Sequence, residues 1–327
     1  MDFMLPTKKL DKASFEKRAL ALFKFQAQQV PVYADFLNHI NKSHLVNDIS
    51  SINQIPFLPI SFFKTHEVIV QNKSAECIFT SSGTTGQQTS KHLVADVSIY
   101  QKAHRIGFEN AYGNIADYTI LALLPSYLER DGSSLIEMVD DMIQQSGKID
   151  SGFYLNDLLA LKHTLVKLDK ANGKVLLLGV SYALLDLLEL GSFELSNTII
   201  METGGMKGRR KEMVKEELHK ILMQGFGVDS IHSEYGMTEL LSQAYSKGQG
   251  VFETSPTMEV LIRDVNDPFS ILPVGYSGGI NVIDLANVNS CAFIATQDLG
   301  KKHENGTFEV LGRFDNSDIR GCNLMVD

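Results

Sequence analysis

The chain has 327 residues, of which 44% are hydrophobic and 21% are charged, and its formal net charge is −9. This composition excludes a disordered protein. A single hydrophobic core usually organises up to roughly 250 to 300 residues, so we expect one large domain with subdomains or two domains. The acidic balance argues against a nucleic-acid binder, because such proteins contact phosphates through basic side chains.

No uncharged apolar run approaches the roughly 18 residues that a membrane span needs, so we expect no span. The first residues do not have the pattern of an export signal. The three cysteines, Cys77, Cys291 and Cys322, are widely separated. Their spacing indicates neither a disulfide framework nor a thiolate zinc site, and it fits a reducing, cytoplasmic compartment. Cys77 and Cys291 lie in apolar runs, which favours core positions for both.

Helical spacing of apolar residues opens the chain. Phe15, Leu22 and Phe23 recur at intervals that predict an amphipathic helix ending before Pro31. We therefore assign residues 1–75 to an N-terminal helical segment that packs on the main domain.

Short apolar runs then alternate with helical patterns across residues 76–254. The expected strands cover residues 76–80, 118–124, 174–179, 197–202 and 230–234. The expected helices cover residues 97–110, 133–145, 156–169, 183–190 and 209–224. This alternation predicts βαβ units and an α/β fold with a mostly parallel sheet, whose ligands bind beyond the carboxyl ends of the strands. Residues 255–327 contain β-rich segments without helices between them, which predicts a smaller β-rich subdomain and a short C-terminal tail.

The most informative motif follows the first expected strand. It reads SSGTTG and consists of Ser81, Ser82, Gly83, Thr84, Thr85 and Gly86. Its glycines let the backbone approach an anion closely, and its hydroxyls donate hydrogen bonds, so it has the chemistry of a phosphate cradle. It is not the Walker-type phosphate loop, because no lysine follows the second glycine directly. A polar surface hairpin is the alternative that these residue types leave open.

Two further clusters combine residue types that suit a nucleotide. Residues 233–239 (SEYGMTE) include an aromatic ring that can stack on a base, a hydroxyl for a phosphate and a carboxylate that can hold Mg²⁺. Residues 295–300 and 311–315 place Asp298 and Arg313 at the ends of two β segments. The aspartate suits sugar hydroxyls and the arginine suits an anion, whereas a turn aspartate and a surface arginine are the structural alternative.

Taken in chain order, these clusters resemble the motif succession of the adenylate-forming superfamily, which includes acyl-CoA synthetases, adenylation domains and luciferase. The succession is SSGTTG, then Gly204-Gly205 after TIIMET, then YGMTE, TQD and GRFD. The whole chain is also similar to a narrower family, the LuxE-type acyl-protein synthetases of bacterial luminescence operons. That likeness includes PFLPISFFKTHEV, LPSYLERDGSSL, TGGMKGRRKEM and the closing GRFDNSDIRGCNLMV.

The resemblance implies an N-terminal-type domain of an adenylate-forming enzyme, which uses ATP and Mg²⁺ to convert a carboxylic acid, here a fatty acid, into an acyl-adenylate. The loop at residues 81–86 would hold the β- and γ-phosphates, with Lys91 as a candidate charge partner. The other implied contacts are Gly204, Gly205, Tyr235 and Gly236 at the adenine, Thr238 at the α-phosphate, Glu239 at Mg²⁺, Asp298 at the ribose, and Arg313 beside the ribose or the phosphate.

The sequence departs from the superfamily in two places. Superfamily members usually continue past GRFD into a domain that carries a catalytic lysine, but this chain ends at Asp327, so we expect that domain to be absent. Either Lys91 or a partner protein then substitutes for the lysine, or adenylation is slow. Lys91 also lies two residues further from the last glycine than usual.

Cys322 stands near the C-terminus, at a place similar to that of the acyl-accepting cysteine of the luminescence synthetases. The resemblance thus implies a thioester on Cys322 and an acyl-reductase or acyltransferase partner. A free thiol in a terminal tail is the alternative.

Three other functions are left open. The first is a truncated acyl-CoA ligase of the phenylacetate type that needs a partner, and the second is a non-catalytic protein that binds a nucleotide or an acyl-adenylate. The third is a serine hydrolase, because Ser181 lies between a strand and a helix, and Asp298 and His303 could complete a triad in the right order. A hydrolase leaves SSGTTG and YGMTE unexplained, and we expect Ser181 to cap its helix instead.

Overall fold

A computed structural model describes residues 4–81, 88–125, 132–155, 157–205, 210 and 213–314. The helices are α1 (Lys12–Gln29), α2 (Pro31–His39), α3 (Phe62–Thr65), α4 (Val97–Tyr112), α5 (Ser134–Ser146), α6 (Leu158–Lys170), α7 (Ser181–Leu188) and α8 (Lys215–Phe226), with short 3₁₀ helices η1 (Ser43–Leu45), η2 (Ile52–Gln54) and η3 (Ile115–Asp117). The strands are β1 (Leu58–Pro59), β2 (Cys77–Thr80), β3 (Lys91–Val94), β4 (Thr119–Leu123), β5 (Gly152–Phe153), β6 (Val175–Val180), β7 (Thr198–Thr203), β8 (His232–Tyr235), β9 (Ala244–Ser246), β10 (Val251–Thr254), β11 (Met258–Arg263), β12 (Ser277–Asp284), β13 (Phe293–Lys302) and β14 (Phe308–Arg313).

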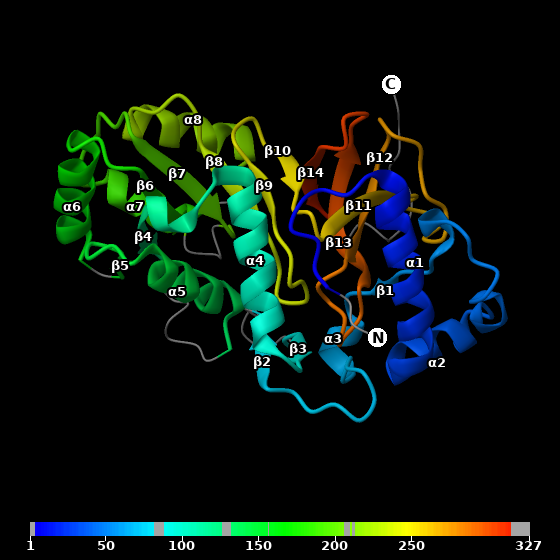
Figure 1. The fold of residues 1–327 in the computed structure, drawn as a ribbon. Helices are drawn as coiled ribbons and strands as arrows, with labels where there is room; N and C mark the ends of the chain where they lie inside the picture. The colour runs from blue at the N-terminus through cyan, green and yellow to red at the C-terminus, as the bar shows by residue number, and fades with distance from the viewer. Residues whose placement is uncertain are drawn as a thin grey trace, which may run out of the picture.

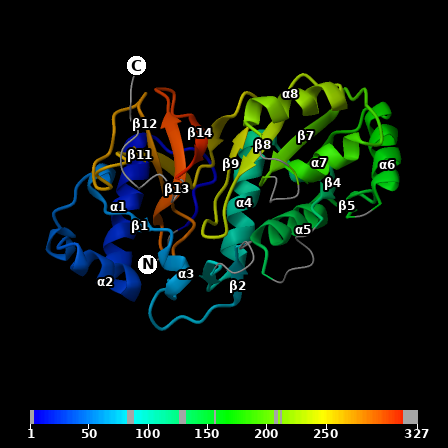
Figure 2. The ribbon, with the colours of Figure 1, turned by 180° about the vertical axis from the view of Figure 1, so that it is seen from behind.

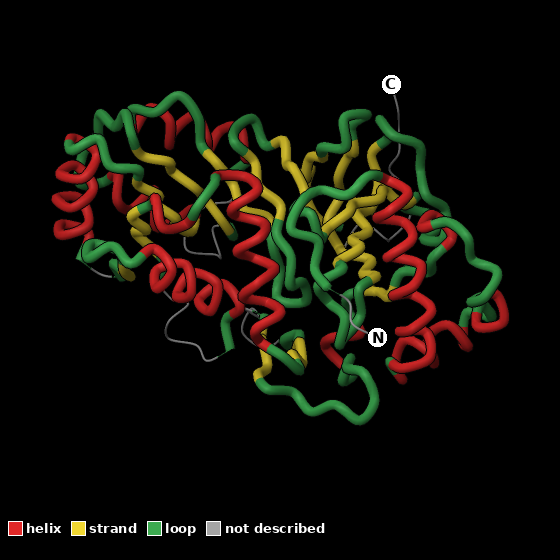
Figure 3. Tube along the Cα trace, viewed as in Figure 1, coloured by secondary structure: helices red, strands yellow, loops and turns green. Residues whose placement is uncertain are grey.

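One large mixed sheet runs through the molecule. Within the described residues it has twelve strands in the order β11-β12-β13-β14-β10-β9-β8-β7-β6-β4-β5, with β1 paired to β13. Helices flank the sheet, and its strands continue across the middle of the molecule (Figures 1 and 3). This architecture confirms the predicted α/β fold.

The half from β5 to β8 is parallel. Every residue of β4 and β6 is buried, which is why both strands appear in the sequence as uninterrupted apolar runs. Helix α4 lies in front of β8 and β9 in Figure 1, and Figure 2 shows these strands from the other side. The carboxyl ends of β7 and β8 lead directly into Gly204 and Gly236.

The half from β9 to β14 is antiparallel, and the N-terminal helices pack on it. The rings of Phe23 and Phe293 meet edge to face, with centroids 5.8 Å apart. The buried Gln26 amide donates to the Asn287 carbonyl oxygen at 2.8 Å and accepts from the Ala292 backbone amide at 2.9 Å. Helix α1 is thus fixed to the loop between β12 and β13.

The hydrophobic core has two parts that share this sheet. The first lies around the parallel strands and α4 to α7. The second lies between α1, α2 and the antiparallel strands. Tyr235 belongs to the second part and Tyr245 to the first, so the polypeptide that follows β8 runs where the two meet.

The first expected strand is not part of this sheet, contrary to the prediction. Strand β2 instead pairs antiparallel with β3 in a separate hairpin, with Thr80 opposite Lys91. The next strand along the chain is β3, and β2 pairs with it instead of with a strand of the large sheet. Among the described helices, none is both long and apolar enough to cross a membrane.

Candidate functional site

Two of the sequence motifs lie side by side at the carboxyl edge of the parallel strands. Strands β7 and β8 are neighbours, with Glu202 opposite Ser233. The Thr203 hydroxyl donates to Glu234 Oε2 at 2.6 Å. Gly204 follows β7 with φ +70°, a left-handed conformation that glycine adopts without strain. This contact brings the Gly204-Gly205 turn next to the YGMTE segment.

Tyr235, Asp298 and Arg313 form a continuous hydrogen-bonded chain. The Tyr235 hydroxyl donates to Asp298 Oδ2 at 2.8 Å, and Arg313 Nε donates to Asp298 Oδ1 at 3.0 Å. Asp298 and Arg313 are opposite each other on β13 and β14. Burial and the Asp298 charge raise the pKa of Tyr235 well above its ordinary value, so the hydroxyl keeps its proton and acts as a donor.

The two end residues of this hydrogen-bonded series, Tyr235 and Arg313, differ in solvent exposure. Tyr235 is buried, with its ring against Phe252 and Phe308, whereas the Arg313 side chain is 79% exposed. A buried aspartate therefore holds an arginine whose guanidinium faces solvent. Such a group can bind an anion without losing its carboxylate partner.

The Thr238-Glu239 turn is held from both sides. His92 Nδ1 lies 2.9 Å from the Thr238 carbonyl oxygen, and the Asn287 side-chain amide donates to the Glu239 carbonyl oxygen at 2.8 Å. The Glu239 side chain is 5% exposed. Burial raises its pKa, while a hydrogen bond from Ser90 lowers it.

Glu239 fits Mg²⁺ only as a single carboxylate ligand. Within the described ranges, no group of three or more His, Cys, Asp or Glu side chains could hold a metal ion. Mg²⁺ is commonly held by one or two carboxylates together with substrate phosphates and water, so a single carboxylate is compatible with a magnesium site.

The described ends of the SSGTTG loop lie against this turn, because Ser90 hydrogen-bonds the Glu239 carboxyl group. The Ser90 backbone amide donates to Ser81 Oγ at 2.9 Å, and the Ser81 amide donates to the Ser90 carbonyl at 3.1 Å. Lys91 follows on β3 with its side chain exposed. The remaining loop candidates lie outside the described residues, and they are Ser82, Gly83, Thr84, Thr85 and Gly86. Cys322 also lies outside them.

A buried polar cluster around Glu202 is not predicted by the sequence analysis. Glu202 accepts from the Ser233 hydroxyl at 2.6 Å, lies 2.9 Å from Lys215 Nζ and 3.4 Å from His219 Nε2. Burial acts to raise the pKa of Glu202, but hydrogen bonding to His219 and the Lys215 charge lower it to about 2. Glu202 is therefore ionised and joins β7, β8 and α8.

The serine hydrolase hypothesis is wrong. The Ser181 hydroxyl donates to Glu202 at 3.3 Å, and Ser181 is the first residue of α7 rather than its cap, which is Val180. Asp298 is occupied by Tyr235 and Arg313, whereas His303 Nε2 lies 2.7 Å from Glu309 Oε1. The three triad candidates thus bind three different partners.

Comparison with known proteins gives one distant sequence relative. No family model matches the chain. It is 22% identical to a long-chain-fatty-acid–luciferin-component ligase of Aliivibrio fischeri over an alignment of 327 residues, which covers 89% of this chain and 83% of that ligase. The chain is thus a distant homologue of that ligase.

Solved structures with the same fold are adenylate-forming enzymes. ATP-bound MatB from Rhodopseudomonas palustris has a TM-score of 0.55 and 17% identity, over 72% of this chain and 47% of MatB. 2-Hydroxyisobutyryl-CoA ligase in its postadenylation state has a TM-score of 0.67 and 10% identity, over 97% of this chain and 74% of the ligase. MenE from Bacillus subtilis, in complex with ATP and magnesium ion, has a TM-score of 0.52 and 18% identity, over 72% of this chain and 49% of MenE. This chain spans about half the length of MatB and MenE, and the likeness shows the fold.

Proposed function

We propose that this chain activates a carboxylic acid with ATP. The acid's carboxylate oxygen attacks the α-phosphorus, a C(O)–O–P bond forms, the bond between the α-phosphorus and the bridging oxygen breaks, and pyrophosphate leaves. The observation that carries this proposal is the connection of the motif segments. Tyr235 bonds Asp298 and Asp298 bonds Arg313, Glu239 follows Tyr235 by four residues and receives a hydrogen bond from Ser90, and Ser90 bonds Ser81.

Each described motif residue has a proposed task. Arg313 offers an exposed positive charge to the ribose or a phosphate, and Asp298 offers lone pairs to the ribose hydroxyls. The Thr238 hydroxyl binds the α-phosphate, and Glu239 holds Mg²⁺, which neutralises phosphate charge. Lys91, exposed beside the loop, adds a positive charge. The reaction needs positioning and charge neutralisation rather than a covalent protein group.

The adenine is assigned to the edge where β7 and β8 end. Gly205 leaves room there, since a Cβ at this position would meet no atom of the described residues within 4 Å. At Gly236, by contrast, a Cβ would collide with the Glu234 carboxylate. Gly236 therefore allows the chain to turn tightly over Glu234 and bring Tyr235 to this edge.

The acyl-transfer step is proposed for Cys322. Its thiolate attacks the acyl carbon of the adenylate, a thioester forms and AMP leaves. The chain has three cysteines, and the two described ones are poor nucleophiles. Burial raises the pKa of Cys77 to about 11 and that of Cys291 to about 12. The homology to a long-chain-fatty-acid ligase supports a fatty acid as the substrate.

The adenylation step is tested by acid-dependent exchange of labelled pyrophosphate into ATP across a panel of carboxylic acids, from short to long chain. Removing one charge-stabilising group commonly costs about 100-fold or more in rate, so we expect Asp298→Asn and Glu239→Gln each to lose at least that. Glu304→Gln, which alters an exposed carboxylate on a loop, serves as the matched control. Wild-type exchange in both site variants would contradict the assignment.

The transfer step is tested by label from the radioactive acid that stays on the denatured protein and is released by hydroxylamine. We expect Cys322→Ser to retain pyrophosphate exchange and lose this label, whereas Cys77→Ser keeps both. Exchange without any retained label in the wild type would assign the acyl group to a soluble thiol instead of Cys322.

A further inference from the structure

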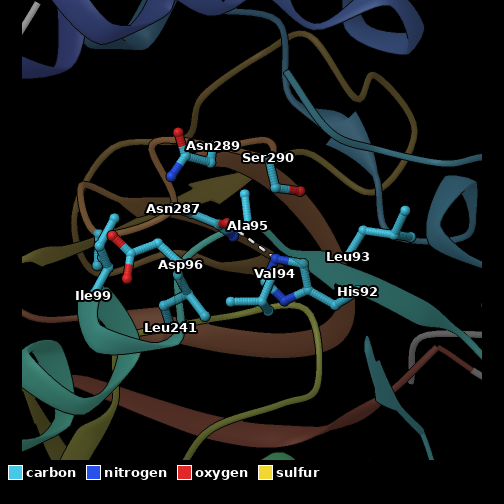
Figure 4. A pocket seen from close by; sticks show the side chains of 11 residues that line it. His92, Leu93, Val94, Ala95, Asp96, Ile99, Leu241, Asn287, Asn289 and Ser290 are labelled. Atoms are coloured by element: carbon cyan, nitrogen blue, oxygen red, sulfur yellow. Dashed lines mark hydrogen bonds between the residues drawn. The ribbon is translucent and has the colours of Figure 1, made fainter. Parts of the chain in front are cut away.

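His92 occupies a fully buried position between Thr238 and Asn287. It is 0% exposed, and Figure 4 shows its ring directed at the Asn287 side chain. Nδ1 lies 2.9 Å from the Thr238 carbonyl oxygen, and Nε2 lies 3.1 Å from Asn287 Oδ1. The Phe63 ring packs edge to face on the imidazole, with centroids 5.6 Å apart.

The hydrogen-bond roles follow from the atoms that face each other. A carbonyl oxygen only accepts, so Nδ1 must carry a proton to bond Thr238. Asn287 uses its amide nitrogen on the Glu239 carbonyl oxygen at 2.8 Å, which leaves Oδ1 toward His92. Burial lowers the pKa of His92 to about 4, so near neutral pH one ring proton is present, and the shorter contact places it on Nδ1. Nε2 then lacks a proton and faces another acceptor, Asn287 Oδ1, so these two atoms share no hydrogen bond. Two consecutive carbonyls of the turn are thus anchored from outside it.

Within the described residues, the space beside His92 is too small for a ligand. The hollow lined by His92, Leu241 and Asn287 measures about 10 Å³, which admits about one water molecule. Tight packing without a ligand cavity indicates that these side chains serve to orient the turn.

Strand β3 also links this anchor to the phosphate loop. Ser90 bonds both the Ser81 hydroxyl and the Glu239 carboxyl group, Lys91 points outward, and His92 points inward to Thr238. The end of the loop and the turn are therefore joined by residues that alternate along one strand.

We propose that His92 and Asn287 are positioning residues for adenylation, which hold Thr238 and Glu239 at a fixed place relative to the Ser81–Ser90 loop. This inference rests on the proposed function. Misplacing a reacting group by about 1 Å can cost on the order of 100-fold in rate, so loss of the anchor should lower kcat. Thr238 and Glu239 act at the α-phosphate, where the bond changes occur, while Tyr235, Asp298 and Arg313 keep their own hydrogen bonds, so kcat should fall by more than the KM for ATP rises.

The test compares His92→Leu with His92→Asn in pyrophosphate exchange. The asparagine amide nitrogen can occupy the place of Nδ1 and still donate to Thr238, whereas leucine cannot. We expect His92→Leu to lower kcat about 10- to 100-fold with an ATP KM within about 3-fold of wild type, and His92→Asn to recover most of the loss. His104→Leu is the matched control, because His104 is also fully buried but lies on α4 beside Asp141.

Three kinetic results would overturn the proposal. The first is a folded His92→Leu protein with the wild-type kcat, and the second is a His92→Asn protein as slow as His92→Leu. A loss of kcat in His104→Leu equal to that in His92→Leu would also overturn it, because general loosening of the core would then explain the effect.

A second readout separates this proposal from the proposed function. Amide hydrogen exchange over residues 234–241 reports the turn directly, where the Leu240 and Leu241 amides donate hydrogen bonds. We expect faster exchange there in His92→Leu and not in His92→Asn. If the wild type performs no acid-dependent exchange of pyrophosphate, the proposed function fails, and unchanged protection in His92→Leu would then overturn the anchor as well.

Discussion

Two neighbouring buried carboxyl groups, Glu202 and Glu234, have opposite electrostatic surroundings. Glu202 receives hydrogen bonds from two hydroxyls and lies beside Lys215 and His219. Glu234 has the Thr203 hydroxyl as its hydrogen-bond donor and faces the Glu202 charge. Burial first, and Glu202 second, raise the pKa of Glu234 to about 7. The residue next to Tyr235 is thus a carboxyl group that titrates near neutral pH.

This difference predicts how the stability of a Glu234→Gln variant changes with pH. The folded protein keeps the Glu234 proton up to about pH 7, whereas the unfolded chain loses it near the ordinary value of 4.5. Wild-type stability therefore falls as pH rises from 4.5 through 7, and glutamine, which does not ionise, removes that loss. Urea unfolding should show the variant gaining about 3 kcal/mol relative to wild type between pH 4.5 and 8. A difference between Glu234→Gln and the wild type that does not change with pH would contradict the raised pKa.

At the scale of elements, buried parallel strands were the most predictable part of the fold. Residues 174–179 and 197–202 were expected as strands and form β6 and β7 with a shift of one residue. Both lie in the middle of the parallel half, where burial on both faces demands a continuous apolar run. Strand β2 was assigned to the wrong sheet, because four residues of strand pattern do not specify a pairing partner.

The site was predictable where motifs carry recognisable chemistry. Tyr235, Asp298 and Arg313 were selected as candidates, and the fold joins them in one hydrogen-bonded chain, while their roles toward ATP stay predictions. His92 and Asn287 were not selected. A lone histidine and a loop asparagine have no spacing signal, because 195 positions separate them and only tertiary packing brings them together.

For the whole molecule, buried histidines and a buried carboxyl group change protonation in overlapping pH ranges. Burial lowers the pKa of His92 and His232 to about 4, below the ordinary 6.5. Both are neutral in the folded protein, so their contribution to stability is lost as pH falls from about 6.5 to about 4. Glu234 acts in the opposite direction between pH 7 and 4.5. Asp141 and Glu202, with pKa values of about 2, lose their contribution only below this range.

These opposing titrations predict a shallow stability curve for the wild type between pH 6.5 and 4.5 and a divergent one for its variants. Glu234→Gln removes the proton uptake of Glu234, so its free energy of unfolding should fall more steeply with acid than that of the wild type. His92 contributes roughly 2 kcal/mol to this fall, and the more exposed His232 contributes less. In His92→Asn that loss is removed, and the curve should instead rise as Glu234 takes up its proton. Urea titrations at half-unit pH steps measure all three curves. Parallel curves would contradict the balance, because they would require His92 and Glu234 to keep their ordinary pKa values in the folded state.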